Sequence, residues 1–362
     1  WMMDIASWRW VFWVALPLTA LVIVVTLAAT RGYKSVLATG RYDWLGLILG
    51  GTGITLLTYG LQNSAVSWSE VGTWGSIVAG IAVLGVFGLV ETRIAHPLVD
   101  FSLWKERLFS GGFFAESAVG FVYIPFLTFI GSLYLISVLG YSPGKASAVI
   151  VITTGTCMLF EPPAGRWVDK VGPGLPITVA LLMQAVALAW IGLFFGPATT
   201  LMQMVIPLAL MGIGVGIALP ACNTAGMSAV DAKRAGMGSG LMQMTFNIPA
   251  ALGVGLVTSI IGTLEASKIS GVLAPELRDA GARYTAAVQD GDISLADEIL
   301  ADVPEGSVEA VKSAAVEAYS SAITVSMSVL SAVALAGAIF AWLVIGRRRT
   351  PDHSTMPETA AG

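Results

Sequence analysis

Two acidic side chains lie inside long apolar stretches of this sequence, where a charge is costly. Glu116 falls within an apolar run over 109–137, and Glu161 lies near the end of another over 146–164. A charged side chain at the centre of a bilayer costs at least about 2.5 kcal/mol on insertion scales. Burial favours the neutral form of a carboxyl group, which is a property that a carrier of protons needs. Glu116 and Glu161 are therefore candidates for proton coupling or substrate binding.

Each acid also has a structural interpretation. Glu116 lies about 12 Å along its helix at 1.5 Å per residue, and a carboxyl group at that depth could instead hydrogen-bond a neighbouring helix. Glu161 directly precedes Pro162 and could form an ion pair with Arg166. The residues alone leave both alternatives open.

Uncharged polar side chains also interrupt the apolar stretches. Gln243 and Asn247 are four residues apart and so share a helix face, with methionine and phenylalanine beside them. This pattern predicts an adaptable apolar cavity, since methionine surfaces repack around varied ligands. Hydrogen bonds between helices are the alternative. The candidate cavity-lining residues are Gln243, Asn247, Phe246, Met242, Gln184 and Asn223.

Nine apolar stretches would position these side chains. The chain of 362 residues is 56% hydrophobic and only 12% charged, whereas soluble domains carry about 25% charged residues. A helix needs about 20 apolar residues to cross a hydrocarbon core of about 30 Å. The sequence therefore predicts an all-α integral membrane fold. The predicted spans are 10–30, 44–63, 73–90, 109–137, 146–164, 174–196, 201–221, 238–262 and 318–346.

The placement of charge predicts the sidedness of the chain. Most Lys and Arg residues fall in alternate connections between the spans and in the segment after the last one. Because cytoplasmic connections carry an excess of Lys and Arg, we expect the C-terminus to be cytoplasmic. The one long polar segment, 263–317, has a strong excess of Asp and Glu. We expect it to be an acidic extracytoplasmic loop with short surface helices, or alternatively a lid that gathers substrate.

Six short motifs occur in order along the chain. They are Ser7-Trp8-Arg9-Trp10-Val11-Phe12, Tyr42-Asp43-Trp44-Leu45-Gly46, Glu91 through His96 to Asp100, Leu139-Gly140-Tyr141-Ser142-Pro143, 165–172 and 236–255. Together they resemble helices six to fourteen of the fourteen-span drug:proton antiporters of the major facilitator superfamily.

The resemblance implies a domain organisation in which helices one to five are missing from this sequence. The implied parts are 1–30 as the last helix of the N-terminal half, 31–108 as two linker helices with cytoplasmic connections, 109–262 as the first five helices of the C-terminal half, 318–346 as the final helix and 347–362 as a cytoplasmic tail. The missing N-terminal half would be a partner within the same chain.

The resemblance also implies a function. The expected activity is export of hydrophobic, cationic small molecules across the cell membrane in exchange for protons, by alternating access. The expected partners are those substrates, protons and the lipid bilayer, with no cofactor, metal or nucleic acid.

One motif carries an implied gating role. Gly165, Asp169, Lys170 and Gly172 match the superfamily's Gly-x-x-x-Asp-Arg/Lys-x-Gly loop, whose aspartate holds an inward-closed arrangement. A carboxylate near a helix N-terminus gains about 0.3 to 1 kcal/mol, which makes such a role physically reasonable. A merely solvated loop is the alternative.

Departures from the antiporter pattern leave the substrate class open. Ile136 stands where a glutamine is usual, and Phe246-Asn247 replaces the usual Arg-Gln. An exporter of lipids, peptides or a self-made antibiotic on the same fold is therefore an alternative, as is a non-transporting membrane fragment. The sequence contains no ATP-binding G-x-x-x-x-G-K-[ST] motif and no H-E-x-x-H, so we expect no enzyme activity.

Overall fold

All regular structure in the described part of the chain is helical. The computed structural model describes residues 9–31, 43–63, 70–94, 99, 101–231, 235–289 and 293–346. The longer helices are α2 (Arg9–Ala29), α3 (Trp44–Asn63), α4 (Val71–Glu91), α5 (Arg107–Thr128), α6 (Pro143–Val171), α7 (Gly174–Phe194), α8 (Leu201–Met227), α9 (Ala235–Val272) and α12 (Glu305–Val344). Some positions named in the sequence motifs lie outside the described residues, as does the predicted tail over 347–362; those positions include Ser7, Trp8, Tyr42 and His96.

These nine helices are the predicted membrane spans. Within the described residues, nine helices are long and apolar enough to cross a membrane, and each overlaps one predicted stretch. A helix of 20 residues, the length of α3, is about 30 Å long, which matches the hydrocarbon core. The prediction of an all-α membrane fold is confirmed.

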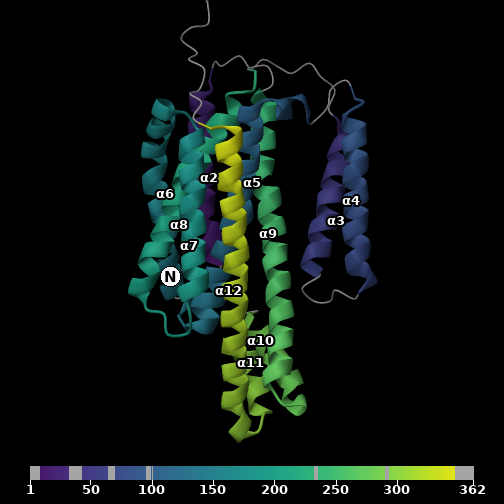
Figure 1. Ribbon diagram of the computed structural model, residues 1–362, viewed down its shortest axis with the longest axis vertical. Coiled ribbons are helices and arrows are strands. Elements are labelled where there is room, and N and C mark those ends of the chain that lie inside the picture. The colour runs from purple at the N-terminus through teal and green to yellow at the C-terminus, as the bar shows by residue number, and fades with distance from the viewer. Residues whose placement is uncertain are drawn as a thin grey trace, which may run out of the picture.

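Helices α5 to α9 and α12 form the main bundle (Figure 1). Helix α7 packs against α8 and α12, α6 packs against α8, and α5 packs against both α8 and α9. The contacts are close because glycines replace side chains at them. A Cβ atom at Gly216 of α8 would lie 2.5 Å from the carbonyl oxygen of Cys157 on α6. Small residues of this kind allow helix backbones to approach, which is how membrane helices gain packing energy.

Helix α5 changes geometry near its end. Pro125 lies inside α5, and the chain continues directly into a π-helical segment, η2 (Phe129–Val138). Proline removes one backbone donor from the helix ladder, and π segments inside helices are rare. Tyr134 of this segment donates a hydrogen bond of 2.9 Å from its hydroxyl to the carbonyl of Gly196.

Helices α3 and α4 form a hairpin at one side of the bundle, seen at the right of Figure 1. Glycines again hold the two helices together, because a Cβ atom at Gly80 would lie 2.7 Å from the backbone nitrogen of Leu57. The hairpin contacts the bundle where Leu61 of α3 lies against Gly255 of α9. By contrast, α2 is exposed along its whole described length.

The segment over 263–317, expected to be a loop with short surface helices, is helical over most of its length. Helix α9 continues to Val272, and α12 begins at Glu305, so both run well past the predicted spans. At 1.5 Å per residue their 38 and 40 residues give lengths of about 57 and 60 Å, close to twice the hydrocarbon core. We call their far ends, with α10 (Arg278–Gln289) and α11 (Ile293–Ala301), the head. Figure 1 shows the head projecting beyond the other helices.

The head has a hydrophobic core of its own. Its buried side chains come from all four helices or the turns between them: Ile269, Leu273, Ala287, Ala296, Ile299, Leu300, Val303, Val311 and Ala314. The hydroxyl of Tyr319 on α12 donates a hydrogen bond of 2.6 Å to the carbonyl of Thr285 on α10. Burial and the nearby carboxylate of Asp297 raise the pKa of the Tyr284 phenol. The segment is therefore a small folded unit and not a solvated connection.

Candidate functional site

Glu116 is buried at the meeting point of three helices. Gly112, Glu116 and Gly120 follow one another at intervals of four along α5 and so share a face. A Cβ atom at Gly112 would lie 2.8 Å from both the carbonyl oxygen of Cys222 and the backbone nitrogen of Gly226 on α8, and one at Gly120 would meet the backbone of Phe246 on α9. The two glycines therefore draw α5 against its neighbours, and the carboxyl group between them is only 4% exposed.

The hydrogen bonding of this carboxyl group is sparse. Its Oε1 accepts from the side-chain amide of Asn223 on α8 at 3.5 Å, the outer limit for such a bond. Its Oε2 is buried and has no hydrogen-bond partner among the described residues. Asn223 is itself exposed and also donates to the carbonyl of Leu219 at 3.3 Å. An exposed amide thus separates a buried carboxyl from open space.

Glu161 occupies a different environment. Its side chain is exposed on α6, which continues beyond it to Val171, and its Oε1 lies 3.9 Å from the thiol of Cys157, one turn earlier. Glu161 and Arg166 are both exposed, and the described part of the structure shows no salt bridge between them. The alternative ion pair is therefore not formed there. Glu161 is therefore available to groups outside the bundle and is not buried by the described residues.

The predicted gating loop is largely helical. Gly165, Asp169 and Lys170 lie in the last two turns of α6, which ends at Val171, so only Gly172 belongs to a connection. Gly172 adopts φ +83°, a conformation that favours glycine, and its N–H donates to the carbonyl of Val168 at 2.8 Å. Asp169 and Lys170 are exposed. The motif is therefore a helix end and a tight corner before α7.

The candidate cavity-lining residues divide into two groups. Gln243 and Asn247 are exposed on α9, where the Asn247 amide donates to the Gln243 carbonyl at 2.8 Å, and Phe246 is half-buried. These residues and Asn223 can line a surface open to ligand.

Met242 and Gln184 are buried instead, so neither side chain lines an open surface in this arrangement of the helices. Met242 is 1% exposed and fills the space left by Gly226 of α8. Gln184 is fully buried where α7 meets Gly214 of α8. Both side chains pack between helices because a glycine on the facing helix provides room.

The sequence reasoning missed a second buried carboxyl group, in the α3–α4 hairpin. Glu91 is 2% exposed and accepts from the backbone N–H of Val99 at 3.2 Å. Its Oε1 and the Oδ2 of Asp43 both lie where a Cβ atom of Gly46 would be, and Asp43 Oδ1 accepts from the Gly46 N–H at 2.8 Å. Glu91 lies at the end of its apolar stretch, where sequence alone does not separate a buried acid from an interfacial one.

Comparison with known proteins decides the family. The model of the Major Facilitator Superfamily matches residues 1–254, which cover α2 to α8 and the first half of α9. The chain belongs to the major facilitator superfamily. It is accordingly a multi-pass membrane protein, and the nine apolar helices agree with that membership.

Relatives of this superfamily member carry names of exporters. It is 26% identical to the Tetracenomycin C resistance and export protein of Streptomyces glaucescens over 98% of this chain and 67% of that protein. It is 27% identical to Multidrug resistance protein Stp of Mycobacterium tuberculosis over 77% of this chain and 51% of that protein. Multidrug export protein EmrB of Escherichia coli is 26% identical over 71% of this chain and 50% of its own length. The chain thus spans about half to two thirds of these relatives.

Proposed function

We propose that this chain belongs to a secondary active transporter that exports hydrophobic, cationic small molecules in exchange for protons by alternating access. Family membership and the exporters among its relatives support the transport class. The observation that carries the proton-coupled mechanism is Glu116, a carboxyl group 4% exposed with a single long hydrogen bond among the described residues.

The environment of Glu116 suits a group that exchanges a proton. A buried carboxylate without a close cation costs several kcal/mol, so the carboxyl group is favoured in its neutral form while α5, α8 and α9 enclose it. Water or a cationic substrate that reached Asn223 would stabilise the charged form and release the proton. Proton release would then be linked to exposure of the site, which is the linkage that antiport requires.

The remaining candidates take roles around this centre. We assign Asn223, Gln243, Phe246 and Asn247 to the substrate cavity because their side chains on α8 and α9 are exposed or half-buried. Glu161, exposed on α6, is proposed as a second point of attraction for a cationic substrate.

The end of α6 is proposed as the gating segment. The last two turns of α6 contain Gly165, Asp169 and Lys170, and the turn after them contains Gly172. The side chain of Asp169 is exposed. The Asp169 carboxylate is thus free to face a helix N-terminus of another part of the protein, where it would stabilise a closed arrangement.

We further propose that the protein lies in the cell membrane with its C-terminus in the cytoplasm. Arg31 follows α2, Arg93 follows α4, Arg107 begins α5 and Lys170 lies at the end of α6, so basic residues gather at one end of the bundle, as the positive-inside rule requires. The head then projects from the opposite, extracytoplasmic face. A membrane-impermeant thiol reagent should label a cysteine placed at exposed Ala301 in intact cells and not one placed after residue 346.

The direct test is Glu116→Gln in the full-length protein, reconstituted in liposomes. Transport driven by a pH gradient should fall at least tenfold, while exchange of labelled for unlabelled substrate, which needs no proton movement, should persist. Glu317→Gln, which alters an exposed carboxylate of the head, should retain gradient-driven transport. A Glu116→Gln protein that still uses the pH gradient fully would remove Glu116 from the coupling mechanism.

A second candidate is export of one antibiotic-like compound. It is favoured by the relative named for tetracenomycin C, because that match covers 98% of this chain and so includes the head, which the family model does not reach. Transport assays with a panel of hydrophobic cations and with tetracenomycin C separate the two candidates, since a multidrug exporter should move several unrelated cations.

A further inference from the structure

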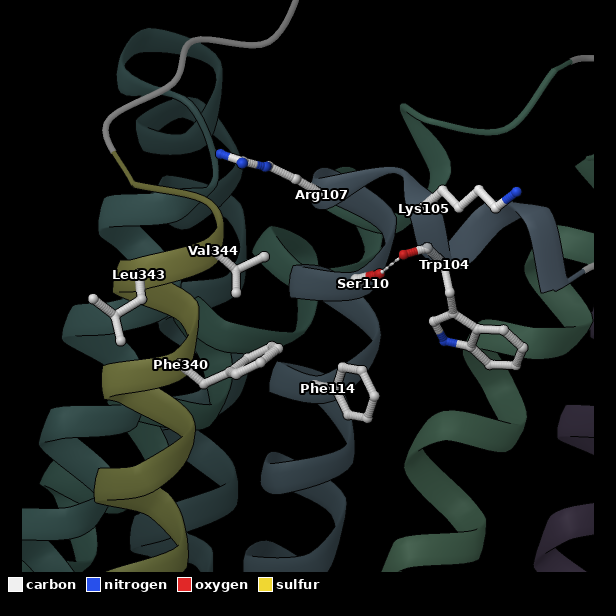
Figure 2. A pocket seen from close by; sticks show the side chains of 8 residues that line it. All are labelled: Trp104, Lys105, Arg107, Ser110, Phe114, Phe340, Leu343 and Val344. Atoms are coloured by element: carbon white, nitrogen blue, oxygen red, sulfur yellow. Dashed lines mark hydrogen bonds between the residues drawn. The ribbon is translucent and has the colours of Figure 1, made fainter.

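A pocket opens between the start of α5 and the end of α12, and Glu116 is not among the residues that line it. Its volume is about 420 Å³, within the range of small-molecule sites. Figure 2 shows the residues that line it: Lys105 and Arg107 lie at the rim with their charged ends on opposite sides, and the rings of Phe114 and Phe340 lie below them. The pocket therefore has a basic rim over an apolar floor.

The floor is built to contact hydrocarbon. Phe114 and Phe340 meet edge to face with their ring centroids 5.3 Å apart, which joins α5 to α12. Phe114 is 48% exposed and Leu343, which also lines the pocket, is 73% exposed. Exposed apolar side chains on membrane helices suit contact with acyl chains, and Phe114 and Leu343 continue the floor of the pocket onto the exposed face of α5 and α12.

The rim lies at the level of the membrane surface. Lys105 and Arg107 border the first turn of α5, and α12 ends at Val344 beside them. Trp104 lines the same pocket, and its ring is fixed against Phe113 at 5.2 Å between centroids. Tryptophan is enriched at the boundary between headgroups and hydrocarbon.

The charge at the rim is positive. Lys105 and Arg107 form no salt bridge with any residue in the described ranges. The exposed Glu106 between them is the acidic group next to the rim in the chain, and its side chain makes no capping hydrogen bond to α5. Three more arginines, 347–349, follow Gly346 in the sequence, just after the end of α12. A basic pocket between membrane helices at this level matches an anionic lipid headgroup.

We propose that this pocket binds one anionic phospholipid from the adjacent leaflet. Its phosphate lies at the rim with Lys105 and Arg107, and one acyl chain lies over Phe114, Phe340 and Leu343. The proposal rests on the chain's place in a membrane and on this pocket alone, so it stands or falls separately from proton-coupled export.

The test is a lipid titration of the delipidated full protein, followed by native mass spectrometry. Phosphatidylglycerol and phosphatidylcholine with identical acyl chains are the two probes, and the affinity for the first bound molecule is measured. We expect phosphatidylglycerol to bind at least tenfold more tightly. Lys105→Gln with Arg107→Gln should weaken it about 30-fold, which corresponds to about 1 kcal/mol for each basic residue at a membrane surface.

Two further variants make the result specific. Arg31→Gln with Arg93→Gln removes the same charge from exposed positions after α2 and α4 and should change phosphatidylglycerol binding less than threefold. Lys105→Arg with Arg107→Lys keeps the charge and should retain binding, which ties any loss in the first variant to the removed charge. Equal affinity for the two lipids, or an equal loss in both charge-removing pairs, overturns the proposal.

Discussion

The contact between α5 and α8 at Gly112 gives the sharpest test of how the carboxyl site is built. A Cβ atom at Gly112 would lie 2.8 Å from two backbone atoms of α8, whereas ordinary van der Waals contact begins at 3.4 Å. Backbone atoms cannot rotate away as side chains do. Gly112→Ala should therefore push the two helices apart by about 0.6 Å, and overpacking of this kind costs about 1–3 kcal/mol.

Gly155→Ala is the matched control. Gly155 lies in α6, and a Cβ atom there would meet nothing within 4 Å. Both changes replace glycine by alanine inside a membrane helix, so the gain in helix propensity, about 1 kcal/mol in water, is common to the two variants. Their difference in stability isolates the cost of the new contact with α8.

The assay is unfolding of the two purified variants in the same detergent, by heat and by increasing SDS. Gly112→Ala should be about 1–3 kcal/mol less stable than Gly155→Ala, and its Glu116 should react faster with a carboxyl-modifying carbodiimide because the 3.5 Å contact with Asn223 is lengthened. If Gly112→Ala is as stable as Gly155→Ala and equally protected, the close packing of α5 on α8 does not bury Glu116.

Three further predictions concern single interactions. Tyr319→Phe removes the buried bond to the Thr285 carbonyl and should destabilise the head by about 1 kcal/mol, measured as faster amide exchange in α10 with no change in α5. Thr153→Val removes a fully buried bond to the Leu208 carbonyl and should cost about 0.6 kcal/mol between membrane helices; a cost above 2 kcal/mol in detergent unfolding would contradict this. Lys268→Ala breaks an exposed ion pair in which Lys268 Nζ lies 3.8 Å from the carboxylate of Glu317 on α12. The free energy of unfolding should change by less than about 0.5 kcal/mol, and adding about 0.5 M salt to the unchanged protein should have an equally small effect on it.

The membrane spans could be predicted from the sequence because one physical requirement, an apolar surface in contact with hydrocarbon, dominates there. The hydrocarbon core demands long apolar helices, and nothing else in the chain shares that composition. Hydropathy gives no boundary for a helix that leaves the membrane and stays helical. The polar parts of α9 and α12 are held by their packing with α10 and α11, through side chains such as Leu273 and Leu300, and such contacts depend on which segments meet in space.

In the candidate site, too, composition predicts some features, whereas others depend on which helices meet in space. Glu116 could be identified because a charge inside an apolar stretch is costly wherever its helix lies. Its partner Asn223 is 107 residues away, and the sequence does not say which helices are neighbours. Met242 and Gln184 were assigned to a cavity for the same reason: their burial depends on Gly226 and Gly214 of α8, whose facing helices had to be known first.

The uninterrupted course of α9 and α12 from the bilayer into the head has a mechanical consequence. Each is a single rod, with no break in α9 at Pro249, so a rearrangement of the bundle is transmitted to the tip as a swing. For a rod of about 57 Å, a tilt of about 10° displaces its far end by about 10 Å. A pair of fluorescent labels, one on the head and one on α3, would therefore detect rearrangements of the bundle that are too small to resolve within the membrane. An antibody bound to the tip of the head would slow the same rearrangements.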